Sequence, residues 1–167
     1  MEKFKKLEEI TSPDIRTTYF VLVNHETGKK REFSIKNLHD EVETIELDET
    51  VPEEVRSQFN VARNLCLYSW FCYPFHNVAC LKAYSTIELA LRIRLGKSEE
   101  TVSSLRSMLE EALAKGFFTE NWIPEAISYL RNVAAHGSSM NGPWSVMILR
   151  RSAGVLNELF FRSQNSS

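Results

Sequence analysis

The sequence predicts a mainly α-helical protein, a four- to five-helix bundle with a small N-terminal β-hairpin or three-stranded sheet. Residues 17–47 hold short runs of β-branched and aromatic residues separated by turn residues, which is typical of strands. From residue 51 onward, apolar residues recur at helical spacing, with prolines and glycines between the runs. We therefore divide the chain into a β-rich segment, 1–50, and a helical domain, 51–167, and we expect the first to pack on the second.

The composition is that of a globular protein. The chain has 167 residues, of which 43% are hydrophobic and 25% are charged, and this excludes a disordered or collagen-like chain. The longest apolar run, 65–75, is too short to cross a bilayer, and the N-terminal residues lack a hydrophobic signal region. Three cysteines do not form a disulfide framework. We expect a cytoplasmic protein with no membrane association.

The charge is distributed unevenly along the chain. The net charge is −2, which is too close to neutral to identify a nucleic-acid-binding protein by itself. Residues 1–60 carry a net charge of −5 and residues 61–167 carry +3. A site for an anion is therefore expected in the second segment.

The first third of the chain is predicted to form strands. One strand is expected over 17–23, a turn over 24–30, and a returning strand over 32–35. Alternation of residue types over 42–47 predicts a third, half-buried strand. A sheet this small needs a covering helix, which the following segment can supply.

Helix signals then follow one another to the end of the chain. Pro52 begins the first predicted helix, and Pro74, Gly96, Gly116 and Gly137 mark later breaks. The predicted helices span 51–73, 76–95, 103–115, 121–136 and 144–162. Residues 138–143 are expected to form a loop. These amphipathic helices with short connections are typical of a bundle.

One short motif stands out at the end of the fourth predicted helix of this series. It reads Arg131-Asn132-Val133-Ala134-Ala135-His136, and Gly137 follows it. An arginine, a polar residue and a histidine at this spacing, on a helix that precedes an interhelix loop, resemble the motif of the HEPN family. The resemblance covers about residues 51–167, and residues 83–92 are also similar to the second helix of that family. Residues 1–50 lie outside the resemblance.

The resemblance implies a metal-independent endoribonuclease that uses no cofactor. The residue types suit that chemistry, since His136 can act as a general base or acid near neutral pH. Arg131 stays charged and can hold phosphate oxygens through a bidentate contact. Asn132 shares a helix face with His136 and can orient the imidazole or hold a phosphate oxygen.

A single copy of the motif does not easily direct both functional groups at one atom. Arg131 and His136 are separated by about 140° around an ideal helix. In the family, two copies meet across a two-fold interface, so the resemblance implies a homodimer with two arginines and two histidines in one cleft. It also implies RNA as the substrate or ligand, a role as a toxin or in phage defence, and an antitoxin or another protein as a partner.

Three further residues are candidates for the same site. Glu88 could support it from the preceding long helix, although Glu88 and Arg92 also suit a surface ion pair. Arg150 and Arg151 could line an RNA path, although a solvated basic helix face explains them equally well.

A non-catalytic function is the alternative. A histidine in the last turn of a helix is favourable through the helix dipole alone, and the HEPN family includes inactive members. The alternative is therefore an RNA-binding module or a protein-interaction and dimerisation module with the same fold.

Cys72, His76 and Cys80 have a spacing that could hold zinc, but Pro74 interrupts them, so we expect buried cysteines and no metal site. The sequence contains no nucleotide-binding loop, serine-hydrolase or zinc-protease motif.

Overall fold

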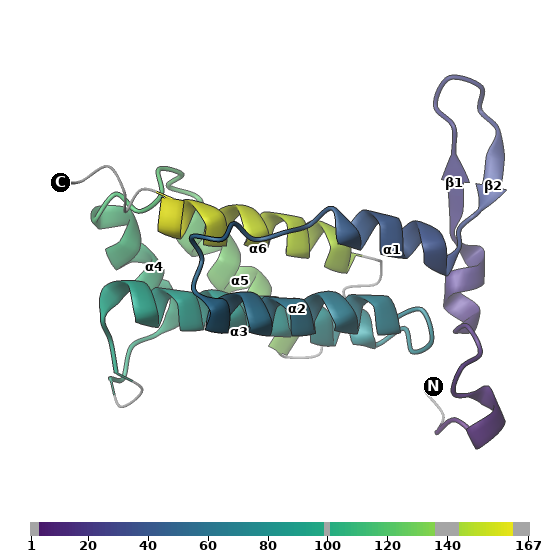
Figure 1. The fold of residues 1–167 in the computed structure, drawn as a ribbon, viewed down its shortest axis with the longest axis horizontal. Helices are drawn as coiled ribbons and strands as arrows, with labels where there is room; N and C mark the ends of the chain where they lie inside the picture. Colours follow the sequence, from purple (N-terminus) through teal and green to yellow (C-terminus); the bar gives the residue numbers. More distant parts are fainter. Residues whose placement is uncertain (1–3, 99–100, 136–143, 162–167) are drawn as a thin grey trace.

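The structure is a computed structural model that describes residues 4–98, 101–135 and 144–161. In these ranges the chain forms a helical bundle with a two-stranded antiparallel sheet at one end (Figure 1). The strands are β1 (Val21–Val23) and β2 (Lys30–Glu32). The α-helices are α1 (Ile35–Glu43), α2 (Glu53–Tyr68), α3 (Phe75–Leu95), α4 (Leu105–Ala114), α5 (Ile123–Ala135) and α6 (Trp144–Phe161). Two short 3-10 helices, Leu7–Glu9 and Ile15–Tyr19, precede the strands.

The predicted helices from residue 51 onward are confirmed, as are the mainly helical class and the hairpin. Pro52 is the N-cap of α2, and Glu53 and Glu54 occupy its first turn, where carboxylates suit the helix dipole. Gly96 ends α3 in the left-handed conformation, with φ at 65°. The first helix ends at Tyr68 rather than at residue 73, because tight turns replace the helical bonds before Pro74.

The predicted third strand over 42–47 is wrong, because helix α1 continues through Glu43 and the residues that follow form a turn and an irregular segment. Ser34 caps α1, since its side chain accepts a hydrogen bond from the Asn37 backbone N–H in a capping box. Leu38, Val42 and Ile45 are buried and follow helical spacing. The alternating segment therefore combines the last turn of α1 with the irregular chain after it, and its buried residues continue the apolar face of that helix.

The first predicted strand is shorter than expected. Residues Ile15–Tyr19 form a 3-10 helix, and only Val21–Val23 pair with β2. The Asp14 side chain accepts a hydrogen bond from the backbone N–H of Arg16, and the Thr17 hydroxyl donates to the Asp14 carbonyl. These local bonds offer the backbone an alternative to a strand.

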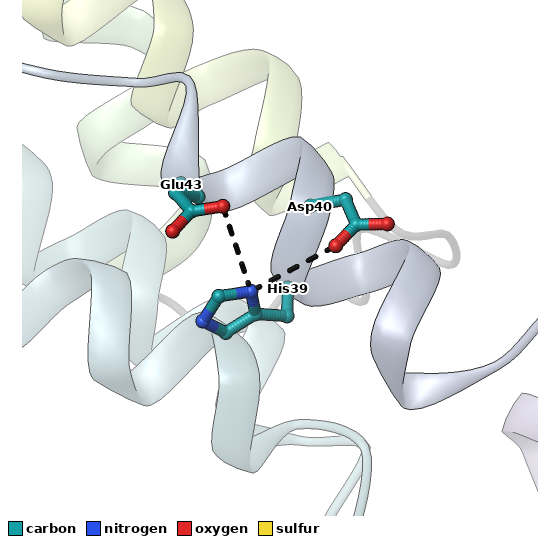
Figure 2. Close-up of side chains that lie close together, drawn as sticks. All are labelled: His39, Asp40 and Glu43. Carbon is teal, nitrogen blue, oxygen red and sulfur yellow. Dashed lines mark ion pairs between the residues drawn. The ribbon is translucent and has the colours of Figure 1, made fainter.

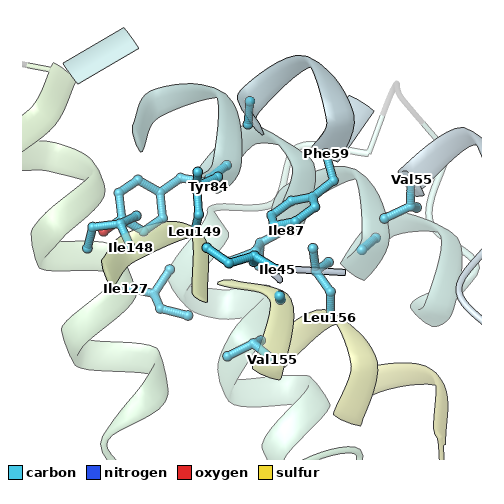
Figure 3. Close-up of a cluster of buried hydrophobic side chains, with 14 of the residues drawn as sticks. Ile45, Val55, Phe59, Tyr84, Ile87, Ile127, Ile148, Leu149, Val155 and Leu156 are labelled. Atoms are coloured by element: carbon cyan, nitrogen blue, oxygen red, sulfur yellow. The ribbon is translucent and has the colours of Figure 1, made fainter. Parts of the chain in front are cut away.

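Helix α3 lies at the centre of the bundle and packs against α2, α4, α5 and α6. The core that surrounds it includes Phe59, Ile87, Leu149 and Leu156, which are almost completely buried (Figure 3). Ile45, which follows α1, belongs to the same cluster. The end of the N-terminal segment is therefore part of the main core.

The 3-10 helix Leu7–Glu9 and the hairpin project from one end of the bundle (Figure 1). Apolar side chains exposed in this part are Phe4, Leu7, Ile10, Ile15, Tyr19, Val21 and Val23. In the described part of the chain, no helix combines the length and apolar character needed to span a bilayer.

Candidate functional site

A polar cavity of about 290 Å³ brings together three of the residues singled out from the sequence. Glu88 reaches it from α3, and Arg131 and Asn132 reach it from α5. The opposite wall is the start of α4, and the complete lining is Glu88, Ser103, Ser104, Leu105, Arg106, Ser128, Arg131 and Asn132. The cavity lies where three helices meet, so the bundle fixes the relative positions of these side chains.

Arg131 is exposed and forms no ion pair with any residue that the structure describes. Its nearest polar contact is Asn132, whose Oδ1 lies 3.5 Å from the Arg131 Nη1. The nearby carboxylate of Glu88 is instead bonded to Arg92, with 3.3 Å between Oε1 and Nη2. The guanidinium of Arg131 can therefore accept an external anion without breaking an internal pair.

The wall formed by α4 contributes a helix N-terminus and a second arginine. The Ser104 side chain caps α4 by accepting a hydrogen bond from the Ser107 backbone N–H at 3.1 Å. Arg106 is bonded to Glu110 at 2.8 Å, and this pair raises the pKa of Arg106. Arg106 is thus neutralised locally, whereas Arg131 is not.

Sequence reasoning missed Ser128 as a member of this cavity. Its Oγ is buried and has no hydrogen-bond partner among the described residues. Ser128 precedes Arg131 by three positions and Asn132 by four, so the three residues share one face of α5. That spacing was the signal in the sequence that could have identified it.

The other two candidate arginines lie elsewhere. The Arg150 guanidinium is 3.0 Å from a Glu41 carboxylate oxygen, and Arg150 lines a different, larger cavity beside α1. Arg151 lies over the Trp122 ring at 5.8 Å and lines a small apolar cavity that also includes Tyr84. Neither arginine lines the cavity that holds Arg131.

His136 lies outside the described residues, as do residues 138–143, for which a loop was predicted. Helix α5 is described as far as Ala135, so the predicted helix that carries the motif is present up to the residue before the histidine.

His76 forms a separate, buried polar group. Its Nδ1 lies 2.6 Å from the Ser145 Oγ, and its Nε2 lies 3.2 Å from the Ser69 Oγ. Burial lowers the pKa of His76 to about 4, so the ring is neutral near pH 7. Both serines are fully buried, and Ser69 and His76 also line the larger cavity beside α1. This group therefore joins α3 to α2 and α6.

Two of the three cysteines, Cys66 and Cys80, are buried as expected, and Cys72 is half-buried. Burial raises the pKa of the Cys66 thiol to about 11 and that of Cys80 to about 12. Cys72, His76 and Cys80 do not gather into a metal-binding geometry.

Within the described ranges, one group of side chains has the composition of a metal site, and it lies on α1 (Figure 2). The Nδ1 of His39 is 4.0 Å from a carboxylate oxygen of Asp40 and 4.0 Å from one of Glu43. All three side chains are exposed, and Asp40 is also bound by Lys36 at 2.7 Å. Surface ion pairs explain these contacts, so we do not assign a metal to this group.

Comparisons of this chain with protein-family models, with curated proteins and with solved structures found no match.

Proposed function

We propose that the chain is a HEPN-like metal-independent endoribonuclease that acts as a cytoplasmic homodimer. Arg131 holds a phosphate of the RNA backbone, Asn132 orients the reacting groups, and His136 transfers a proton. Glu88 supports the site indirectly through its pairing with Arg92, which keeps its carboxylate away from Arg131. A role as a toxin or in phage defence, with an antitoxin as partner, belongs to the same proposal.

The proposed reaction is an attack of a ribose 2′-hydroxyl on the adjacent phosphorus. One histidine takes the proton of the hydroxyl as the new O–P bond forms, and the bond from phosphorus to the 5′-oxygen breaks. A second proton donor supplies the proton that the leaving oxygen needs. The products are a 2′,3′-cyclic phosphate and a 5′-hydroxyl, so no metal or water is consumed in this step.

The observation that carries the proposal is the state of Arg131. An exposed guanidinium without an ion pair in the described structure, in a polar cavity with Asn132 and Ser128, is suited to a phosphate. Its neighbour Arg106 is already paired with Glu110, which singles Arg131 out among the cations of this cavity.

A cleavage assay on a mixed RNA pool tests the assignment of Arg131. We expect Arg131→Ala to reduce the cleavage rate by about a hundredfold or more, since such losses follow removal of one preorganised group at a developing charge. Arg131→Lys keeps the charge but not the bidentate geometry, so it should recover only part of the rate. Lys36→Ala, an exposed cation on α1, is the matched control and should leave the rate within twofold of the wild type.

Equal rates for wild type and Arg131→Ala would contradict the role of this residue. Circular dichroism spectra of the Arg131 variants and the wild type serve as the control, because a variant that has lost helical signal would lose activity through unfolding.

The second candidate function is a non-catalytic protein-interaction module. The observation that favours it is the group of apolar side chains exposed on residues 4–23, in a part of the chain that projects from the bundle. Exposed apolar groups of this kind are typical of protein interfaces. Under this alternative, Phe4→Ser combined with Leu7→Ser abolishes partner binding, and purified wild-type protein yields no RNA cleavage product.

A further inference from the structure

A second cavity, larger than the one that holds Arg131, shares no lining residue with it. It has a volume of about 740 Å³ and lies among the hairpin, α1, the end of α2 and the starts of α3 and α6. This volume falls in the range of about 300–1,000 Å³ that is common for small-molecule sites. Aromatic rings of Phe20, Phe33 and Trp70 form part of its wall.

These rings form a continuous aromatic surface. The Phe33 ring centroid lies 6.3 Å from that of Phe20 and 6.1 Å from that of Trp70. Such separations are in the range of favourable ring contacts, so the surface is held in place by its own packing. Trp70 is only 9% exposed, which anchors the surface to the core of the bundle.

The strand register places one arginine on the same face of the hairpin. Leu22 pairs with Arg31 in the antiparallel ladder, and at the base of the hairpin the Phe33 backbone N–H donates a hydrogen bond of 3.2 Å to the Phe20 carbonyl. Because side chains two residues apart share a face, Phe20, Leu22, Arg31 and Phe33 all lie on the cavity side. The neighbouring Lys30 pairs with Val23 and belongs to the opposite face.

Arg31 is also the cation of this cavity that lacks an internal partner. Arg150 is bonded to Glu41 at 3.0 Å, and Asp40 is bonded to Lys36 at 2.7 Å. No ion pair to the Arg31 side chain occurs among the residues that the structure describes. The cavity therefore combines an aromatic wall with one unneutralised positive charge at its hairpin end.

We propose that this cavity binds a small aromatic organic anion, with the rings against Phe20, Phe33 and Trp70 and the acidic group on Arg31. The proposal does not depend on ribonuclease activity, because the cavity shares no lining residue with the one that holds Arg131. The bound anion would span the hairpin and the bundle and hold the two together.

Fluorescence titration of the full chain with 8-anilinonaphthalene-1-sulfonate tests this directly. The dye is an aromatic anion, and N-phenyl-1-naphthylamine is its neutral counterpart. We expect saturable binding of one sulfonate dye per chain, and Arg31→Ala should weaken it about tenfold or more, as loss of a charged hydrogen bond does. Lys30→Ala, the matched control on the other hairpin face, should change it less than twofold.

Two further arms locate the site. Arg31→Ala should leave binding of the neutral dye within twofold, because only the charged contact is removed. Thr44 is an exposed residue at the end of α1 that lines the cavity, and Thr44→Trp should weaken both dyes by occupying space. Equal affinity of the sulfonate dye for wild type and Arg31→Ala, or binding that does not saturate, would overturn the proposal.

Discussion

Several charged side chains of the described residues pair with a neighbour on the same helix, and Arg131 forms no such pair. Arg92 with Glu88 and Arg106 with Glu110 are both pairs four residues apart. Such exposed pairs contribute little to stability, but they determine which charges are available to a ligand. The cavity is also lined by Glu88 and Arg106, each of which has its own partner. The guanidinium of Arg131 forms no ion pair within the described structure, so it is available to a ligand.

The buried His76 makes stability depend on pH in a defined direction. Its pKa is about 4 in the folded protein and about 6.5 when exposed, so the unfolded chain binds more protons between these values. The contribution of His76 to the free energy of unfolding is therefore fully present above about pH 6.5 and is lost as the pH falls toward 4. The shift corresponds to about 3 kcal/mol, and urea unfolding from pH 4 to 7 should show this loss for the wild type.

His76→Asn should remove this contribution from the pH dependence, whatever its effect on stability at pH 7. Ser107→Ala is the control, because this exposed serine of α4 carries no titratable group and its substitution should leave the slope unchanged. A slope that is the same for wild type and His76→Asn would show that the ring titrates normally in the folded state. Asp14 acts in the same direction at lower pH, since its contacts with Arg16 hold its carboxyl pKa well below the usual range.

Among the elements, α1 depends on a single capping residue. Ser34→Ala removes the side chain that accepts the Asn37 backbone N–H, and we expect a loss of about 1 kcal/mol in the free energy of unfolding. Ser107→Ala is the matched control within α4, where the serine is exposed and helical, and it should change stability by less than about 0.5 kcal/mol. A nearly neutral Ser34→Ala would contradict the assignment of Ser34 as the residue that caps α1.

The elements also show how much of the fold could be predicted from the sequence. The helices from Glu53 onward have long apolar periodicity and clear proline or glycine boundaries, and their predicted positions agree with α2 to α6. The segment 42–47 was wrongly predicted to be a strand, because alternation over six residues does not distinguish a strand from the end of a helix and the chain that follows it. The Ser34 and Asn37 capping pair was visible in the sequence and would have indicated a helix that begins at Ile35.

The candidate site was predicted only in part, for a physical reason. Arg131, Asn132 and Glu88 line one cavity because α3 and α5 pack together. Ser104 and Arg106 reach the cavity because α4 packs against α3 and α5. No short motif in the sequence indicates this tertiary packing. For the same reason, Arg150 is adjacent to Arg151 in the chain but lines another cavity.

At the scale of the whole molecule, the proposed site requires two copies of the chain. We expect the cleavage rate per chain to fall on dilution, in parallel with the dissociation of a dimer measured by analytical ultracentrifugation. The reason is that each copy supplies only part of the groups at the scissile phosphate. A rate per chain that stays constant while the protein is monomeric would contradict the composite site.

The proposed reaction is a metal-free attack by the 2′-hydroxyl that depends on His136. It is tested by the end chemistry of products from a defined RNA in excess chelator, for wild type and for His136→Ala purified identically. We expect 2′,3′-cyclic phosphate ends with wild type alone, and no cleavage of the same RNA carrying 2′-O-methyl groups throughout. Equal products from His136→Ala, or cleavage of the methylated RNA, would contradict it.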